Sequence, residues 1–126
     1  MNVSVSSGSR VFLMSVFLVS MAVFPQAHTK LEKSEPAAGA TLTTAPRQIR
    51  LWFNETIDPA VSKIEVTSNS RTVAVSGMHV MNGKELMASV TGAVSSGTYT
   101  VAWQTAGDDG HVVKGDFSFT VKATTH

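Results

Sequence analysis

The chain has 126 residues, a formal net charge of +1 and no cysteine. This length is typical of one domain. The small charge gives no electrostatic reason to expect nucleic acid as a partner, and the lack of cysteine excludes disulfides, thiolate metal sites and cysteine nucleophiles. Hydrophobic residues make up 43% of the chain, which is enough for a packed core and too many for a disordered chain.

An apolar run near the start of the chain indicates export. Val11–Phe24 is apolar apart from two serines, and Arg10 precedes it. A charged region followed by an apolar one is typical of a secretory signal, and this run is shorter than the roughly 20 residues of a membrane span. No second long apolar run follows. We therefore expect a soluble mature protein in the periplasm or another exported compartment.

The position of signal cleavage decides which residue becomes the new amino terminus. Cleavage after Ala27 divides the chain into a signal peptide, residues 1–27, and a mature domain, residues 28–126. A cut after Ala22 is the alternative, because Ser20-Met21-Ala22 fits the small-x-small rule better. Only cleavage after Ala27 leaves His28 as the first residue.

The mature chain alternates short apolar segments with turn signals. In Gln48–Asn54, Ile49, Leu51 and Phe53 share one face and are predicted core residues, while Arg50 and Trp52 share the other. Pro36–Pro46 is predicted to be loop, and Asn82-Gly83 predicts a tight hairpin turn. About seven strands at this spacing, with no helix, predict an all-β antiparallel sandwich of immunoglobulin-like size. His28–Pro36 is predicted to be extended. The remaining predicted strands are Val61–Thr67, Thr72–Val75, Gly77–Met81, Glu85–Val90 and two within Thr98–Val121.

The last of these segments contains the first site candidates. In Thr98–Val121, two alternating strands flank the polar connection Gly107-Asp108-Asp109-Gly110-His111. Glycine and aspartate are expected in a turn, but an imidazole two residues after a carboxylate is not needed for turning. Asp109 and His111 are therefore candidate site residues. Trp103, on the first strand, is predicted to pack between the sheets.

The mature sequence resembles the CopC family of small exported copper-binding proteins. Three stretches carry the resemblance: HTKLEKSEPAAGATL, LWFNE and YTVAWQTAGDDGHVVKGDFSFTV. The resemblance implies a Greek-key β-sandwich or barrel that holds a cupric ion near one end. The implied ligands are His28, through its amine and its imidazole, with Asp109 and His111. Glu55 matches an acidic residue near or at the metal and is either a ligand or a hydrogen-bond acceptor beside it.

The chemistry of these side chains agrees with that implication. A free amino-terminal histidine offers an amine and a ring nitrogen to one ion, His111 adds a third nitrogen, and Asp109 adds an oxygen. Nitrogen and oxygen donors suit Cu(II), which also stands highest in the affinity order of divalent metals. Because protons compete for the nitrogens, affinity should fall in acid.

A second, softer site is a further possibility. Some family members carry a methionine-rich loop for Cu(I), and the comparable region here contains Met78, His79, Met81 and Met87. Met78, His79 and Met81 are the second-site candidates, with His79 and Met81 on one face of a strand. Thioethers suit Cu(I), although methionines near a hairpin are more often core filler.

The leading hypothesis is a monomeric, non-enzymatic protein that sequesters or carries Cu(II) in copper resistance or homeostasis. The family resemblance implies a membrane copper transporter or another copper protein of the cell envelope as partner. One alternative is a copper-dependent oxidative enzyme with an amino-terminal histidine brace, and another is a metal-free structural sandwich.

Overall fold

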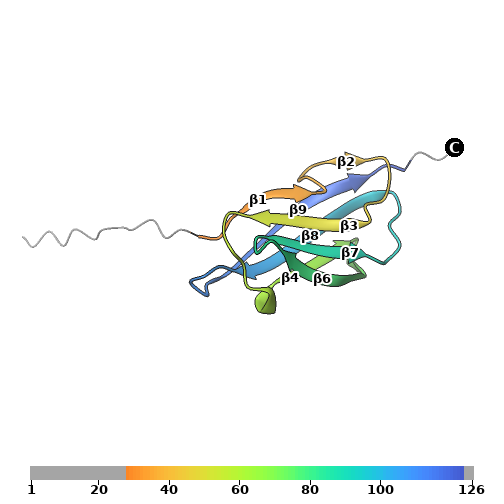
Figure 1. Ribbon diagram of the computed structural model, residues 1–126. Coiled ribbons are helices and arrows are strands. Elements are labelled where there is room, and N and C mark those ends of the chain that lie inside the picture. The colour runs from red at the N-terminus through yellow and green to blue at the C-terminus, as the bar shows by residue number, and fades with distance from the viewer. Residues whose placement is uncertain (1–27, 124–126) are drawn as a thin grey trace, which may run out of the picture.

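The computed structural model describes residues 28–123, which form a β-sandwich of two sheets (Figure 1). The predicted signal peptide, residues 1–27, and both candidate cleavage points lie outside the described residues. In the part described, no helix is long and apolar enough to cross a membrane. The elements of residues 28–123 are β1 (Leu31–Glu35), β2 (Thr41–Leu42), β3 (Gln48–Phe53), the 3-10 turn η1 (Pro59–Val61), β4 (Lys63–Ser68), β5 (Arg71–Val73), β6 (Val75–Met81), β7 (Glu85–Val90), β8 (Gly97–Ala106) and β9 (Val112–Val121).

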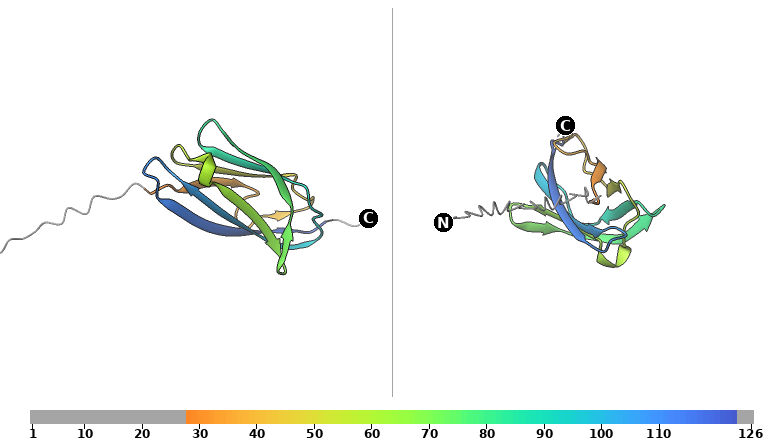
Figure 2. Two further views of the ribbon diagram at one scale, coloured as in Figure 1. Left: turned by 90° about the horizontal axis from the view of Figure 1, so that it is seen from below. Right: turned by 90° about the vertical axis from the view of Figure 1, so that its left-hand side faces the viewer.

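The two sheets contain four and five strands. Their orders are β1-β3-β7-β6 and β2-β9-β8-β4-β5, and the layers lie face to face (Figure 2). The pairs are antiparallel except that of β2 with β9. The predicted sandwich is confirmed, but the described chain has nine strands instead of about seven. One of the additional strands, β2, has two residues within the predicted loop Pro36–Pro46, too few for an alternating pattern to reveal.

The core lies between the layers, where the alternation on β3 predicted it. Ile49, Leu51 and Phe53 are buried, and Trp52 between them is only half-buried. Trp103 of β8 packs edge-on against Phe53, with 5.2 Å between ring centroids. The predicted placement of Trp103 is therefore confirmed, although its side chain remains partly exposed.

Two hairpins were also predicted correctly from their turn residues. Asn82 and Gly83 join β6 to β7 with φ angles of 51° and 75°, the left-handed conformations that a type I′ turn requires. The β8–β9 hairpin pairs ten residues of each strand, from Gly97 with Val121 at one end to Ala106 with Val112 at the other.

This hairpin runs the length of the sandwich and so separates its two ends. The end that carries residues 28–30, 54–55 and 107–111 is called the site pole here. The opposite end, with residues 36–47, 68–74, 91–96 and 122–123, is called the far pole. Both views of the ribbon place the chain's entry at residue 28 and the β8–β9 turn at the same end (Figures 1 and 2). The fold thus brings the amino-terminal segment and the β8–β9 turn, which contain the predicted ligands, to the same pole.

Candidate metal centre

The segment before β1 is fixed to the end of β3 by Asn54. The Asn54 side-chain oxygen accepts a hydrogen bond from the Lys30 amide at 2.8 Å, and its amide group donates to the His28 carbonyl at 3.3 Å. The Asn54 backbone amide also donates to the Lys30 carbonyl at 3.0 Å. These three bonds hold the backbone of His28–Lys30 against the end of β3.

Glu55 adds a second attachment one residue further along. The hydroxyl of Thr29, which is buried, donates a hydrogen bond of 2.6 Å to the Glu55 carboxylate. Because Thr29 and His28 are adjacent, this bond restricts where the His28 side chain can lie. Glu55 therefore acts on the position of the amino-terminal segment, and this contact favours the prediction of a hydrogen-bond acceptor over that of a ligand.

The β8–β9 turn approaches the same carboxylate through Gly107. Gly107 is buried, and a Cβ atom added to it would overlap the Glu55 carboxylate and the Thr29 hydroxyl. Glycine allows this approach, since a larger residue would displace the Glu55 side chain from the Thr29 hydroxyl or push the turn away. The three segments of the site pole are thus in direct contact around Glu55.

Within the turn, Asp109 and His111 form a hydrogen-bonded pair. One oxygen of Asp109 accepts the His111 backbone amide at 3.0 Å, and the other lies 3.0 Å from the ring Nδ1 of His111. A ring proton on Nδ1 would leave the Nε2 lone pair free for a metal ion, the arrangement in which a carboxylate orients a ligating histidine. Both side chains are exposed at the tip of the hairpin.

The electrostatics of the turn link it to the amino-terminal histidine. The side-chain hydrogen bond from His111 lowers the pKa of Asp109, and the backbone hydrogen bond and the charges of His111 and His28 lower it further. His28 therefore lies within electrostatic range of Asp109. A carboxylate that stays ionised in mild acid is a ready ligand for a cation.

The three predicted ligands share a pole but do not surround one point. Among the described residues, no group of three or more histidine, aspartate or glutamate side chains is arranged to hold a metal ion. Asp109 and His111 bond to each other, and Asp108 beside them is exposed. A shared ion would require these side chains to reorient.

Two of the three second-site candidates, His79 and Met81, lie on the outer face of the four-stranded sheet. His79 is opposite Met87, and Met81 is opposite Glu85, so His79 and Met81 share a face as predicted. Met78 and Met81 are 41% and 36% exposed, so the alternative that they fill the core is wrong for both. A register shift at Gly77, with φ of 65°, separates Met78 from the regular part of β6.

Trp52 lies on this outer face as a surface aromatic. The Lys33 ammonium and the Arg50 guanidinium lie 4.6 and 4.8 Å from its ring centroid. Arg50 donates at 2.6 Å to Glu85, which is buried, and this hydrogen bond raises the pKa of Arg50 above its usual value. Trp52 thus lies between two basic side chains on the outer surface of the sheet.

Sequence reasoning missed the residues that hold the site together. Thr29, Asn54 and Gly107 received no role, although each contacts another segment of the site pole. Asn54 directly follows β3 and Gly107 directly follows β8, so both lie where a strand gives way to a turn. Their partners are 24 or more residues away, so no local pattern could identify them.

The comparisons with known proteins agree with this architecture. The chain is 34% identical to "Copper resistance protein C" of Xanthomonas campestris pv. juglandis over 125 residues, covering 93% of this chain and 96% of that one. It is 32% identical to "Protein YobA" of Escherichia coli K12 over 114 residues, covering 87% and 90%. The crystal structure of CopC from Methylosinus trichosporium OB3b superposes with a TM-score of 0.70 at 26% identity, covering 79% of this chain and 98% of that one. The family model of the CopC domain matches residues 31–122, and the chain therefore belongs to the CopC family.

Proposed function

We propose that this protein binds copper outside the cytoplasm and serves copper resistance or homeostasis. The observation that carries the proposal is that His28 and the Asp109–His111 pair lie at the same pole of the sandwich, where Thr29, Glu55 and Gly107 are in contact. The names of the similar copper resistance proteins support it. The signal-like segment in residues 1–27 supports a periplasmic location.

We infer that the bound ion is Cu(II) and that the mature chain begins at His28. Cleavage after Ala27 would add a free amine to the imidazoles of His28 and His111 and to the Asp109 carboxylate. Three nitrogens and one oxygen suit the tetragonal preference of Cu(II). Asp109 has a further role, because it orients the His111 ring through Nδ1.

In this proposal Glu55 is a positioning residue. Its carboxylate already accepts the Thr29 hydroxyl and lies under Gly107, so it holds the amino-terminal segment near the turn. Preorganisation of this kind reduces the ordering cost of metal binding. Glu55 would affect affinity without contacting the ion.

Binding rather than catalysis is proposed, with delivery to or from a membrane copper transporter or another copper protein of the envelope. The exposure of Asp109 and His111 at the hairpin tip supports exchange with a partner, since an ion held there is accessible from outside. A monomer can present this site, because its proposed ligands come from one chain.

The first test combines intact mass with a metal titration. The exported protein should have the mass of residues 28–126, and it should bind one Cu(II) tightly per chain. The matched control is a protein of residues 28–126 with one additional glycine before His28. This extension moves the free amine away from His28 and leaves every side chain in place. Equal affinity of the two proteins would contradict the amino-terminal chelate.

Copper affinity should fall steeply below about pH 6. A free amine and imidazoles have ordinary pKa values of about 7.7–8.0 and 6.5, so protons compete for these nitrogens first. The pKa of Asp109 is lowered from its ordinary value, so its carboxylate stays ionised through this range. Competition titrations from pH 5 to 8 measure the dependence. A pH-independent affinity would exclude nitrogen ligands.

A softer, weaker site is proposed on the outer face of β6 and β7. His79 and Met81 share this face with Met87, which lies opposite His79. Imidazole and thioethers are ligands for Cu(I). The pair of substitutions His79→Ala and Met81→Leu should weaken Cu(I) binding at least tenfold without changing the Cu(II) titration. Met78→Leu is the control, because Met78 lies within the register shift between Ser76 and His79, and an equal loss there would contradict the assignment.

A further inference from the structure

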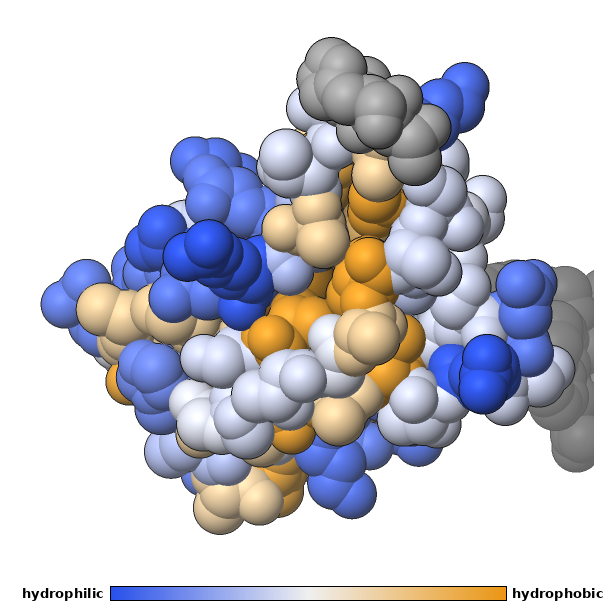
Figure 3. Space-filling view, turned by 90° about the vertical axis from the view of Figure 1, so that its right-hand side faces the viewer, coloured by the Kyte–Doolittle hydropathy of each residue, from blue (hydrophilic) through white to orange (hydrophobic). Residues whose placement is uncertain are grey.

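The far pole carries a cavity of about 400 Å³, at the opposite end of the sandwich from the candidate metal centre. Figure 3 views this pole, where polar residues surround a hollow with hydrophobic residues in it. The cavity lies between the β4–β5 turn and the connection from β7 to β8. It is lined by Ser68, Asn69, Arg71, Thr72, Val73, Ala74, Gly92, Ala93, Ser95, Ser96 and Tyr99.

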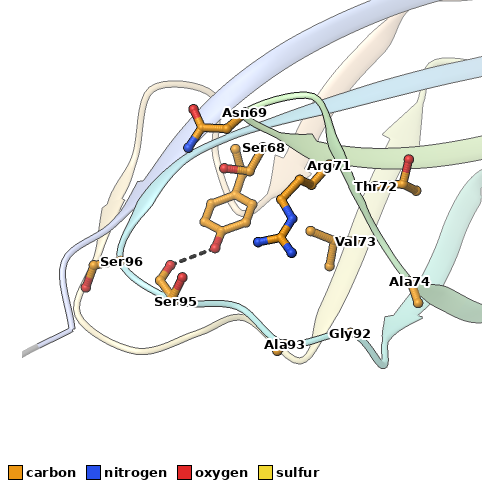
Figure 4. Close-up of a pocket in the computed structure, with 11 residues that line it drawn as sticks. Ser68, Asn69, Arg71, Thr72, Val73, Ala74, Gly92, Ala93, Ser95 and Ser96 are labelled. Atoms are coloured by element: carbon orange, nitrogen blue, oxygen red, sulfur yellow. Dashed lines mark hydrogen bonds between the residues drawn. The ribbon is translucent and has the colours of Figure 1, made fainter.

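Arg71 is the single charged residue of this lining. Its guanidinium group extends into the cavity, beside Val73 (Figure 4). Within residues 28–123 it forms no ion pair and no side-chain hydrogen bond, whereas Arg50 donates to Glu85 at 2.6 Å. No carboxylate lines the cavity. The five N–H donors of Arg71 are therefore available to a ligand from outside.

Internal hydrogen bonds hold the walls of the cavity in place. The Tyr99 hydroxyl donates to the Ser95 carbonyl at 2.7 Å (Figure 4). The amides of Thr91 and Gly92 both donate to the Ala74 carbonyl at 2.9 Å. A Cβ atom on Gly92 would lie 2.7 Å from the Ala74 nitrogen, so the β7–β8 connection fits closely against the chain between β5 and β6. The cavity is thus preformed, which lowers the cost of binding.

The charge distribution along the sandwich gives the far pole a positive sign. Its segments, residues 36–47, 68–74, 91–96 and 122–123, contain Arg47, Arg71 and Lys122 and no acidic residue. The site pole, by contrast, carries three acidic residues, Glu55, Asp108 and Asp109, and one lysine, Lys30. Basic residues without acidic neighbours attract anions toward the cavity.

We propose that this cavity binds a small organic carboxylate. The planar guanidinium of Arg71 matches a carboxylate in bidentate geometry. Val73, Ala93 and the ring of Tyr99 offer apolar contact for a short carbon chain. The volume lies within the range of about 300–1,000 Å³ for small-molecule sites. This site is separate from the candidate metal centre, and its occupation does not require copper.

The test is an amide-shift titration of the metal-free protein by NMR, with propionate at constant ionic strength. Saturable shifts are expected at Arg71, Gly92 and Ser95. Propionamide, the neutral isostere, should produce none of them. Inorganic phosphate should bind more weakly than propionate, because it lacks the apolar body. Phosphate binding as tight as that of propionate, or equal shifts with propionamide, would overturn the carboxylate assignment.

Two charge-matched variants locate the site. Arg71→Gln should weaken propionate binding at least tenfold. Arg47→Gln removes the same charge from the same pole outside the cavity and should change the affinity less than threefold. If the two variants lose affinity equally, the pole attracts anions only through its general charge and the proposed cavity site is wrong. Both residues are exposed, so both variants should fold.

Discussion

Replacing His111 by alanine should weaken Cu(II) binding by a factor of about 100 or more. Loss of a residue that only supports a metal ligand typically costs 10–100-fold, and His111 is proposed as a ligand itself. Its loss also leaves Asp109 without the side-chain bond that is the largest cause of its lowered pKa. The affinity should be measured by competition with a chelator of known strength, because direct titration saturates when binding is tight.

His79→Ala is the matched control for this variant. It also removes one exposed imidazole, but from the outer face of β6 instead of the site pole. The control should leave the Cu(II) affinity within threefold of the original. An unchanged affinity in His111→Ala, or an equal loss in both variants, would remove His111 from the proposed site.

Gly107→Ala should reduce both the stability of the fold and the affinity for copper. The added methyl group would overlap the Glu55 carboxylate and the Thr29 hydroxyl, so the Glu55 side chain, the turn or the amino-terminal segment must move. Overpacking of this kind costs about 1–3 kcal/mol of unfolding free energy. Since each of these movements breaks the Thr29–Glu55 bond or separates the amino-terminal segment from the turn, we expect at least a tenfold loss of Cu(II) affinity. Urea denaturation and competition titration measure the two effects.

Two further variants distinguish this contact from a general glycine effect. Gly39→Ala introduces strain of about 1–2 kcal/mol through its left-handed φ of 76°, but nothing lies near its Cβ position, and copper affinity should not change. Combining Gly107→Ala with Glu55→Ala makes space for the methyl group, so the stability cost of the first change should shrink. A cost that stays the same in the double variant would show that Glu55 is not the obstacle.

Much of the fold could be predicted from local sequence patterns. Alternation on β3 predicted which residues enter the core, and Asn82-Gly83 predicted the β6–β7 turn with its left-handed angles. These features depend on side-chain period and on backbone preferences of neighbouring residues, which the sequence displays directly. Strand β2 was missed because two residues show no period, and its pairing with β9 depends on chain nearly eighty positions away.

The candidate site was only partly visible in the sequence. His28, Asp109 and His111 were chosen by residue type and by resemblance to the CopC family. What joins their segments is a set of long-range contacts, the Thr29 bond to Glu55, the Asn54 bonds to the first residues, and the approach of Gly107. Hydrogen bonds between residues 24 or 26 positions apart have no local signature.

The sequence by itself determined the strand class, the core face of β3, the tight turns and the donor types available for a metal ion. Only the tertiary structure decided that Glu55 is engaged by Thr29, that Met78 and Met81 face solvent, and that Arg71 has no acidic partner among residues 28–123. The physical reason is how far apart in the sequence the interacting residues are. Period and turn preference act over a few residues, whereas pairing, exposure and charge neighbours arise where distant strands meet.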